Sequence, residues 1–338
     1  MIRIGGSVKG AIVKTVLNVI ALLLALIAAG AAQAQTAAPG QALPNKAVQI
    51  IVPNPPGGGP DFIARLIAPK LNAALRQSVV VENRSGANGV VGTEFAARAA
   101  ADGSVIAFGN AGTHAINATL YKRLPYDPVR DFAAISELAS ATMVLAAHPA
   151  VPANSVRELI ALAKKAPGKL NIAIAGATGE LAGNALKLQA GIDMKNIPYK
   201  GGGPATIAIV SGESDLTLTN YTAVAKLAEA GKLKMLGVTG ARRATLIPNV
   251  PTVAENGLDG YEYELWYGLF VPVRTPAPVV QALYQEVARI LGMPEIRERL
   301  TATAHEVIGS TPEQFSDKVR REVEKYRKII LESGMQQE

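Results

Sequence analysis

A run of three glycines between a strand and a helix constrains this chain more than any other feature. The β-branched run 48–52 predicts a buried strand, and apolar residues recur at helical spacing after Asp61. Gly57–Gly59 therefore lie in a strand-to-helix turn, where glycine lets the backbone approach a ligand closely. Since the first amides of a helix have no partner within it, this turn suits an anion. A tight turn without a ligand is the alternative.

The second half of the chain repeats the arrangement. Gly201–Gly203 follow a strand that ends near Pro198, and Pro204 is placed for the first turn of the next helix. Strands alternate with helices on both sides of about residue 140, which predicts two α/β units. The chain leaves the first unit through 143–147 and returns through the extended segment 261–271.

This order predicts an α/β protein of two lobes around a hinged cleft. We expect lobe 1 to comprise 42–139 and 268–338, and lobe 2 to comprise 140–267. In open α/β sheets, ligands bind beyond the carboxyl ends of the strands. Two such edges would face each other across the cleft and close about the hinge. The sequence thus favours capture of a small solute, and no reaction is predicted.

The first 34 residues have the pattern of an export signal. Arg3, Lys9 and Lys14 form a basic region, an apolar Leu-rich run follows, and Ala32-Gln33-Ala34 gives the small-x-small pattern of a cleavage site. We expect cleavage after Ala34 and a periplasmic location. A permanent membrane anchor is the alternative, but the apolar run is short for a spanning helix.

Composition excludes several kinds of chemistry. The chain has no cysteine, which rules out disulfides and thiolates. It has three histidines, of which His148 and His305 have no metal partner at useful spacing, so no metal or cofactor is expected. Loss of the basic signal would lower the net charge from +7 to +4. With no basic block in the mature chain, nucleic acid is not an expected partner.

Motifs of nucleotide binding and of hydrolysis are also missing. Gly86, Gly89 and Gly92 have the wrong spacing for a dinucleotide fingerprint, and the first glycine loop lacks the GK[ST] of a phosphate loop. Neither a G-x-S-x-G elbow nor an H-E-x-x-H motif is present. We therefore expect no catalytic residues, although an exported enzyme of the same architecture is kept as an alternative.

Three side chains near the predicted cleft have open roles. Asp61 is interpreted as the residue that caps the first helix, because a carboxylate beside an anionic ligand would repel it. His114 follows a glycine-rich strand end and either contacts the ligand or packs in the core. Asn220, also at a strand end, either donates its amide to a carboxylate or stabilises a turn.

Several motifs together resemble one family. They run in one register from about Pro44 to the C-terminus and comprise Val52-Pro53 to Asp61-x-x-x-Arg65, Val81-Glu82-Asn83-Arg84-x-Gly86-Ala87, Pro125-Tyr126-Asp127, Pro198-Tyr199-Lys200-Gly201 and Pro251-Thr252-x-x-Glu255. On these residues the chain resembles the solute receptors of tripartite tricarboxylate transporters, the Bug family of periplasmic binding proteins.

The resemblance implies a type II periplasmic-binding fold, a carboxylate or dicarboxylate ligand, and a membrane permease as partner. It also implies that backbone amides of two facing loops hold the ligand. Carried onto this chain, the implied ligand-binding residues are Pro56, Gly57, Gly58 and Asp61 in the first loop, Tyr199, Lys200, Gly201 and Gly202 in the facing loop, Thr113 and His114 in a third, and Gly176, Ala177 and Thr178 in a fourth.

This sequence departs from the family pattern within the expected cleft. Asn54, which we include among the binding residues, stands where an aromatic residue is common, and Pro60 stands where Thr or Ser is common. These changes leave the fold expectation intact but leave the particular acid open. We expect a monomer that delivers its ligand to a permease; a receptor for a signalling system is the alternative.

Overall fold

The structure is a computed structural model that describes residues 46–199 and 202–335. The predicted signal segment and its cleavage site after Ala34 lie outside the described residues, and so do Lys200 and Gly201. The signal, its removal and the export that they imply therefore stay predictions.

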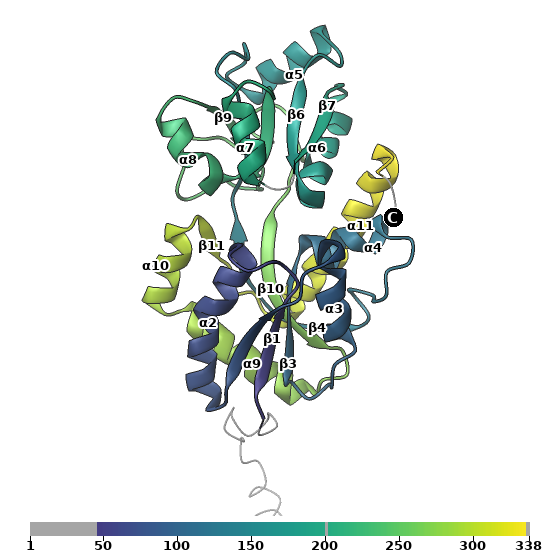
Figure 1. The fold of residues 1–338 in the computed structure, drawn as a ribbon, viewed down its shortest axis with the longest axis vertical. Coiled ribbons are helices and arrows are strands. Elements are labelled where there is room, and N and C mark those ends of the chain that lie inside the picture. The colour runs from purple at the N-terminus through teal and green to yellow at the C-terminus, as the bar shows by residue number, and fades with distance from the viewer. Residues whose placement is uncertain (1–45, 200–201, 336–338) are drawn as a thin grey trace, which may run out of the picture. The chain divides into compact units, whose positions relative to one another are not determined.

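Within the described residues the strands form two sheets (Figure 1). The first sheet has six strands in the order β11-β4-β10-β3-β1-β2, and the second has five in the order β7-β6-β8-β5-β9. The strands, in chain order, are β1 (Val48–Val52), β2 (Val79–Asn83), β3 (Val105–Asn110), β4 (Phe132–Ala141), β5 (Met143–Ala147), β6 (Asn171–Ala175), β7 (Lys195–Tyr199), β8 (Leu216–Asn220), β9 (Lys234–Val238), β10 (Leu265–Pro272) and β11 (His305–Val307).

Helices connect and cover these strands. They are α2 (Gly59–Leu75), the 3₁₀ turn η2 (Ala87–Gly89), α3 (Val90–Ala97), the π-helical turn η3 (Gly112–Ile116), α4 (Asn117–Leu120), α5 (Val156–Lys165), α6 (Gly176–Ala190), α7 (Gly202–Val210), α8 (Tyr221–Glu229), α9 (Ala277–Leu291), α10 (Pro294–Ala302) and α11 (Pro312–Ser333). The sequence marks the start of α11 clearly: Thr311 and Gln314 form a reciprocal capping box, with Pro312 at the first helical position.

Both sheets are mixed rather than wholly parallel. β1 pairs in parallel with β2 and β3, as the strand–helix–strand order of the sequence predicts. β10 runs antiparallel to both β3 and β4. The chain enters β10 from the second sheet, so it meets the parallel strands from their carboxyl ends. The predicted two-unit α/β fold with a second crossing is confirmed.

The chain passes between the sheets at Thr142 and again between β9 and β10. Ser140 and Ala141 pair with Trp266 and Leu265 in the first sheet. The first sheet therefore keeps the chain up to Ala141 and takes it back at Leu265. These points lie two and three residues from the lobe boundaries predicted at 139/140 and 267/268. The boundaries themselves stay a prediction.

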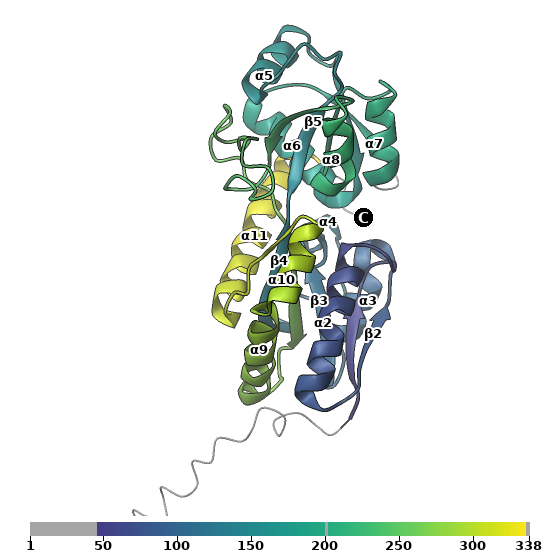
Figure 2. The same cartoon turned by 90° about the vertical axis from the view of Figure 1, so that its left-hand side faces the viewer.

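Each sheet buries both faces, which explains its near-continuous apolar strands. In the first sheet, α2 and α9 cover one face and α3 and α11 the other, and α11 runs along β4 (Figure 2). In the second sheet, α6 packs in one cluster, while α7 and α8 pack in another with Val144 and Ala146.

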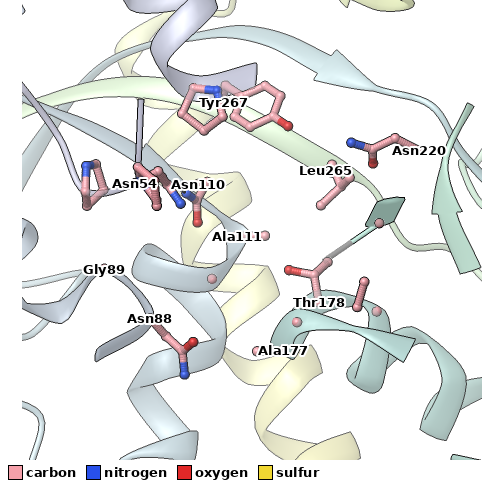
Figure 3. A pocket seen from close by; sticks show the side chains of 18 of the residues that line it. Asn54, Asn88, Gly89, Asn110, Ala111, Ala177, Thr178, Asn220, Leu265 and Tyr267 are labelled. Carbon is pink, nitrogen blue, oxygen red and sulfur yellow. Dashed lines mark hydrogen bonds between the residues drawn. The ribbon is translucent and has the colours of Figure 1, made fainter. Parts of the chain in front are cut away.

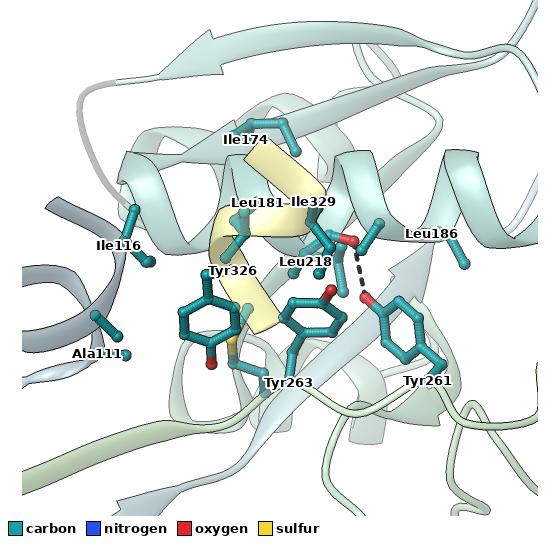
Figure 4. Packing of buried hydrophobic residues seen from close by; sticks show 14 of the residues in the cluster. Ala111, Ile116, Ile174, Leu181, Leu186, Leu218, Tyr261, Tyr263, Tyr326 and Ile329 are labelled. Carbon is teal, nitrogen blue, oxygen red and sulfur yellow. Dashed lines mark hydrogen bonds between the residues drawn. The ribbon is translucent and has the colours of Figure 1, made fainter. Parts of the chain in front are cut away.

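The last turns of α11 leave the first sheet and pack against α6. Tyr326 and Ile329 meet Leu181 in one buried cluster with two tyrosines of the returning segment (Figure 4). One of them, Tyr261, donates its hydroxyl to the carbonyl of Ala182 at 2.9 Å. A single apolar cluster therefore includes residues from both sheets.

A buried ion pair fixes α11 beside the returning segment. Lys318 on α11 lies 2.7 Å from the carboxylate of Glu137, whose side chain is 4% exposed, and 3.2 Å from that of Glu264. Four residues further along α11, Glu322 accepts a hydrogen bond from the indole N–H of Trp266. Burial raises the pKa of Glu137, although the lysine opposes this change. Lys318 therefore offsets part of the cost of burying the Glu137 carboxylate.

We predict that Lys318→Met destabilises the fold by about 3–5 kcal/mol, because it leaves a buried carboxylate without its partner. Urea unfolding at pH 7 measures this. Arg327→Met is the matched control on the same helix: its pair with Glu324 is largely exposed, so a loss below about 1 kcal/mol is expected. Adding Glu137→Gln to Lys318→Met should recover part of the loss. Equal losses for the two single variants would contradict the assigned role.

Candidate functional site

A cavity of about 610 Å³ lies between the carboxyl ends of the parallel strands of both sheets (Figure 3). This is the location that α/β sheets use for ligands, and the volume falls in the range of about 300–1,000 Å³ of small-molecule sites. Its lining comprises Pro53, Asn54, Pro55, Pro60, Ser85, Gly86, Ala87, Asn88, Gly89, Asn110, Ala111, Gly112, Leu265 and Tyr267 from the first sheet and its loops, and Met143, Ala175, Gly176, Ala177, Thr178, Gly179, Gly202, Leu218, Thr219 and Asn220 from the second sheet and its loops.

No charged side chain lines this cavity in the part of the chain that the structure describes. The polar side chains are asparagines, hydroxyls and the phenol of Tyr267. Burial raises the pKa of Tyr267 to about 12, so its O–H stays protonated and can donate. A charged ligand would therefore be met by dipoles and not by an opposite charge.

One of these dipoles is the start of α6. This 15-residue helix begins at Gly176, and no side chain caps its first turn in the described residues. Gly176, Ala177 and Thr178 line the cavity, and their backbone N–H groups have no acceptor within the helix. Such a terminus carries about half a positive charge and favours an anion.

The loop after β2 has an unusual backbone that also faces the cavity. Ala87 and Asn88 have φ angles of 45° and 51°, in the left-handed region that L-residues other than glycine rarely adopt. Such strained positions gather at ligand sites, where surrounding contacts enforce them. Thr93 is one of the residues that hold this loop in place, because its hydroxyl donates to the carbonyl of Gly89 at 2.9 Å.

Asp61 does not cap α2. The helix begins three residues earlier than expected, with Gly58 at the N-cap and Asp61 inside the first turn. The reason is Pro60, which suits the first turn and brings the helix start forward. Asp61 instead reaches back: one carboxylate oxygen accepts the N–H of Gly57 at 2.9 Å, and the other accepts Nε of Arg65 at 2.9 Å.

Six of the predicted binding residues line the cavity: Asn54, Gly176, Ala177, Thr178, Gly202 and Asn220. Pro56, Gly57, Gly58 and Asp61 do not line it, and the N–H of Gly57 is already bound by Asp61. Lys200 and Gly201 lie outside the described residues, so their predicted contacts stay predictions.

The third predicted loop lies behind the cavity wall. His114 is fully buried and stacks on Phe270 with ring centroids 4.0 Å apart, and burial lowers its pKa to about 3. It is therefore neutral at physiological pH and brings no positive charge to the site. Thr113 is 1% exposed and hydrogen-bonds with Asn110, which does line the cavity.

Tyr199 lies at a neighbouring cavity rather than the main one. Its hydroxyl donates to Glu213 at 2.9 Å. This contact turns the Tyr199 hydroxyl toward Glu213, and its implied role as a ligand contact stays a prediction.

Sequence reasoning missed most of the lining, including the loop Ser85–Gly89, Asn110 and Tyr267. One signal could have found the loop Ser85–Gly89 and Asn110. The loop follows β2 and Asn110 ends β3, and the carboxyl ends of such parallel strands share one edge of a sheet. Tyr267 lies within a strand that runs the opposite way, so no comparable signal marks it in the sequence.

Two α/β sheets with a neutral, amide-rich cavity between their strand ends define a solute-binding protein of the periplasmic class. Residues 63–335 match the family model described as TctC, the tripartite tricarboxylate transporter family receptor. The chain belongs to this family, which confirms the resemblance inferred from its motifs. Because the family consists of binding proteins, the enzyme alternative is set aside.

Relatives match over nearly the whole chain. A protein encoded in the tcbD-tcbE intergenic region of Pseudomonas sp. strain P51 is 35% identical over 86% of this chain and 87% of its own length. The protein BugT of Bordetella pertussis is 32% identical, with 92% of this chain and 97% of BugT covered.

Solved structures agree in fold. An R. palustris protein determined with adipate has a TM-score of 0.75 at 33% identity, covering 86% of this chain and 98% of that one. MatC from Rhodopseudomonas palustris, with bound malate, has a TM-score of 0.72 at 30% identity, covering 85% of this chain and 100% of that one.

We predict that Asp61→Asn destabilises the protein by about 1.5–3 kcal/mol at pH 7, because it weakens charge-assisted bonds to Gly57 and Arg65. Burial alone would raise the pKa of Asp61, but the Gly57 amide, Asn83 and Arg65 together hold it below 3.8. A carboxyl with a lowered folded pKa contributes stability above its unfolded pKa and loses it as pH falls.

The gap between wild type and Asp61→Asn should therefore shrink as the pH falls from 5 through the folded pKa of Asp61. Urea unfolding across this range measures it. The matched control is Asp317→Asn, whose pair with Arg320 is more than half exposed and should matter little at any pH. A gap for Asp61→Asn that stays constant down to pH 2 would contradict the assigned role.

Proposed function

We propose that this chain is a periplasmic receptor that captures a small carboxylate in the cavity between its two sheets. The observation that carries the proposal is an uncharged cavity wall into which the uncapped start of α6 opens. Free backbone amides suit an anion, because they supply oriented positive dipoles without a competing counter-charge.

The comparisons support a carboxylate over other anions. The two R. palustris neighbours were determined with adipate and with malate, which are both dicarboxylates. The cavity of this chain offers donors that suit a carboxylate: backbone amides, a phenol and asparagine amides. The length of the acid and the number of its carboxylates are left to experiment.

The family also supports the rest of the proposal. TctC-type receptors belong to tripartite tricarboxylate transporters, so we propose that the loaded receptor delivers its ligand to a membrane permease of that type. In the described residues no helix is both long and apolar enough to span a membrane. We propose a periplasmic location on the basis of the export signal predicted from the sequence, and we propose that the receptor works as a monomer.

Calorimetric titration tests the ligand class. Adipate, malate, succinate and benzoate are the anionic probes, and putrescine is the cationic control. Saturable heat from at least one carboxylate, with none from putrescine, is expected. Heat from putrescine alone would overturn the proposal.

A variant at the start of α6 tests the mechanism. Thr178→Asp places a fixed carboxylate among the amides proposed to bind the ligand, so affinity should fall at least about tenfold by repulsion. The folded state should not suffer, because a carboxylate in the first turn stabilises a helix by about 0.3–1 kcal/mol. Titration and thermal unfolding of the same sample separate these effects.

Gln314→Glu is the matched control for Thr178→Asp. It adds the same charge at the same third position of a helix, but in α11, where Gln314 does not line the cavity. Its affinity should stay within about twofold of wild type, since exposed charges beyond a Debye length are screened. Equal weakening by both variants would show that the start of α6 is not the anion site.

A further inference from the structure

The orientation of one cavity amide is fixed by its neighbours. We propose that Asn54 presents its NH₂ group to the cavity as a permanent donor, and that it selects carboxylates carrying an acceptor oxygen at that point over those carrying an ammonium group. The inference rests on the proposed function, because it concerns a second contact in the same cavity.

The amide of Asn110, the neighbour of Asn54, is oriented first. The backbone N–H of Thr113 donates to the side chain of Asn110 at 3.1 Å. Of the two ends of an asparagine amide, only the oxygen can accept from a backbone N–H, so this bond decides which end of the Asn110 amide is Oδ1. The NH₂ end of Asn110 must then face the other way.

That NH₂ end meets Asn54. Nδ2 of Asn110 donates to Oδ1 of Asn54 at 3.2 Å, and the two side chains lie next to each other at the cavity (Figure 3). With its oxygen taken, Asn54 has Nδ2 left. In the described residues no acceptor pairs with this nitrogen, and Asn54 lines the cavity. The chain of hydrogen bonds thus runs from the backbone N–H of Thr113 through the amide of Asn110 to the amide of Asn54, whose NH₂ group is left for the ligand.

The backbone of Asn54 is held as well. Its carbonyl accepts Nδ2 of Asn83 at 3.1 Å, and Oδ1 of Asn83 accepts Nη2 of Arg65 at 2.9 Å. Arg65 is in turn paired with Asp61. A flip of the Asn54 amide would therefore put two NH₂ groups face to face without freeing any compensating bond.

This arrangement selects ligand groups that accept a hydrogen bond over groups that donate one. A keto, hydroxyl or carboxylate oxygen accepts from an NH₂ group, whereas an ammonium group only donates. An ammonium placed there would leave two donors facing each other, each without an acceptor and out of water, which costs about a factor of ten or more in affinity. Asn54 is a binding residue in this proposal, and Asn110 is a positioning residue.

Reversal of the Asn54 amide is the test. In Asn110→Asp, one carboxylate oxygen still accepts from Thr113, but the other can only accept from Asn54. Asn54 must then turn its NH₂ group toward the new carboxylate and its oxygen toward the cavity. The preference between acceptor and donor ligands should reverse, although Asn110 itself need not touch them.

The probes are two matched pairs, oxaloacetate with aspartate and 2-oxoglutarate with glutamate, each pair sharing a skeleton and differing in a keto or an ammonium group. Titration gives the ratio of affinities within a pair. We expect wild type to favour the keto member by about tenfold or more, and Asn110→Asp to favour the amino member.

A charge control is necessary, because an added carboxylate by itself favours the less anionic amino member. Asn88→Asp adds that charge at another lining position, where the left-handed backbone also suits Asp. The inference requires that Asn110→Asp shift the ratio at least about tenfold further than Asn88→Asp. Equal shifts would overturn it.

Asn54→Asp is the second variant, in case Asn110→Asp does not fold. Its carboxylate still accepts from Asn110 but offers no donor, so the keto preference should again be lost beyond the charge control. A keto preference that survives would overturn the inference while leaving carboxylate capture intact. If no carboxylate binds wild type, the proposed function fails first and this inference falls with it.

Discussion

An anion that leaves water must be met by positive charge or by oriented dipoles, and this cavity offers only dipoles among its described residues. That constraint explains why so many elements begin at one place. η2, η3, α6, α7 and α8 each start at or next to a residue that lines the cavity. Backbone amides are fixed by the helices to which they belong, so they need little reorganisation when a ligand arrives.

Dipoles hold a ligand only if the two walls that carry them are held in register. The ion pair of Lys318 with Glu137 and Glu264 fixes α11 to the first sheet and to the segment that returns to it. Beyond that point α11 packs against α6, whose first residues line the cavity. One helix therefore connects the core of the first sheet to a helix of the second whose start lines the cavity.

Side chains at the cavity add selectivity to this general attraction. The network from Asp61 through Arg65 and Asn83 reaches the backbone of Asn54, and a second route through Thr113 and Asn110 reaches its side chain. Asp61 was interpreted from the sequence as the cap of the first helix, and Thr113 was implied by the resemblance to contact the ligand. In the structure both residues support Asn54 through their neighbours, and contact of either with a ligand stays a prediction.

The sequence by itself determined the alternation of strands and helices, the two glycine-rich loops and the family motifs, because periodicity, turn residues and caps act over a few neighbouring positions. It therefore identified the cavity residues that start helices at strand ends, such as Gly176 and Asn220. It could not show that Tyr267 and Asn110 line the cavity, or that Gly57 does not line it and donates its N–H to Asp61. Only the tertiary structure decided these, because pairing between distant strands and bonds such as Asn110 to Asn54 depend on which segments meet in space.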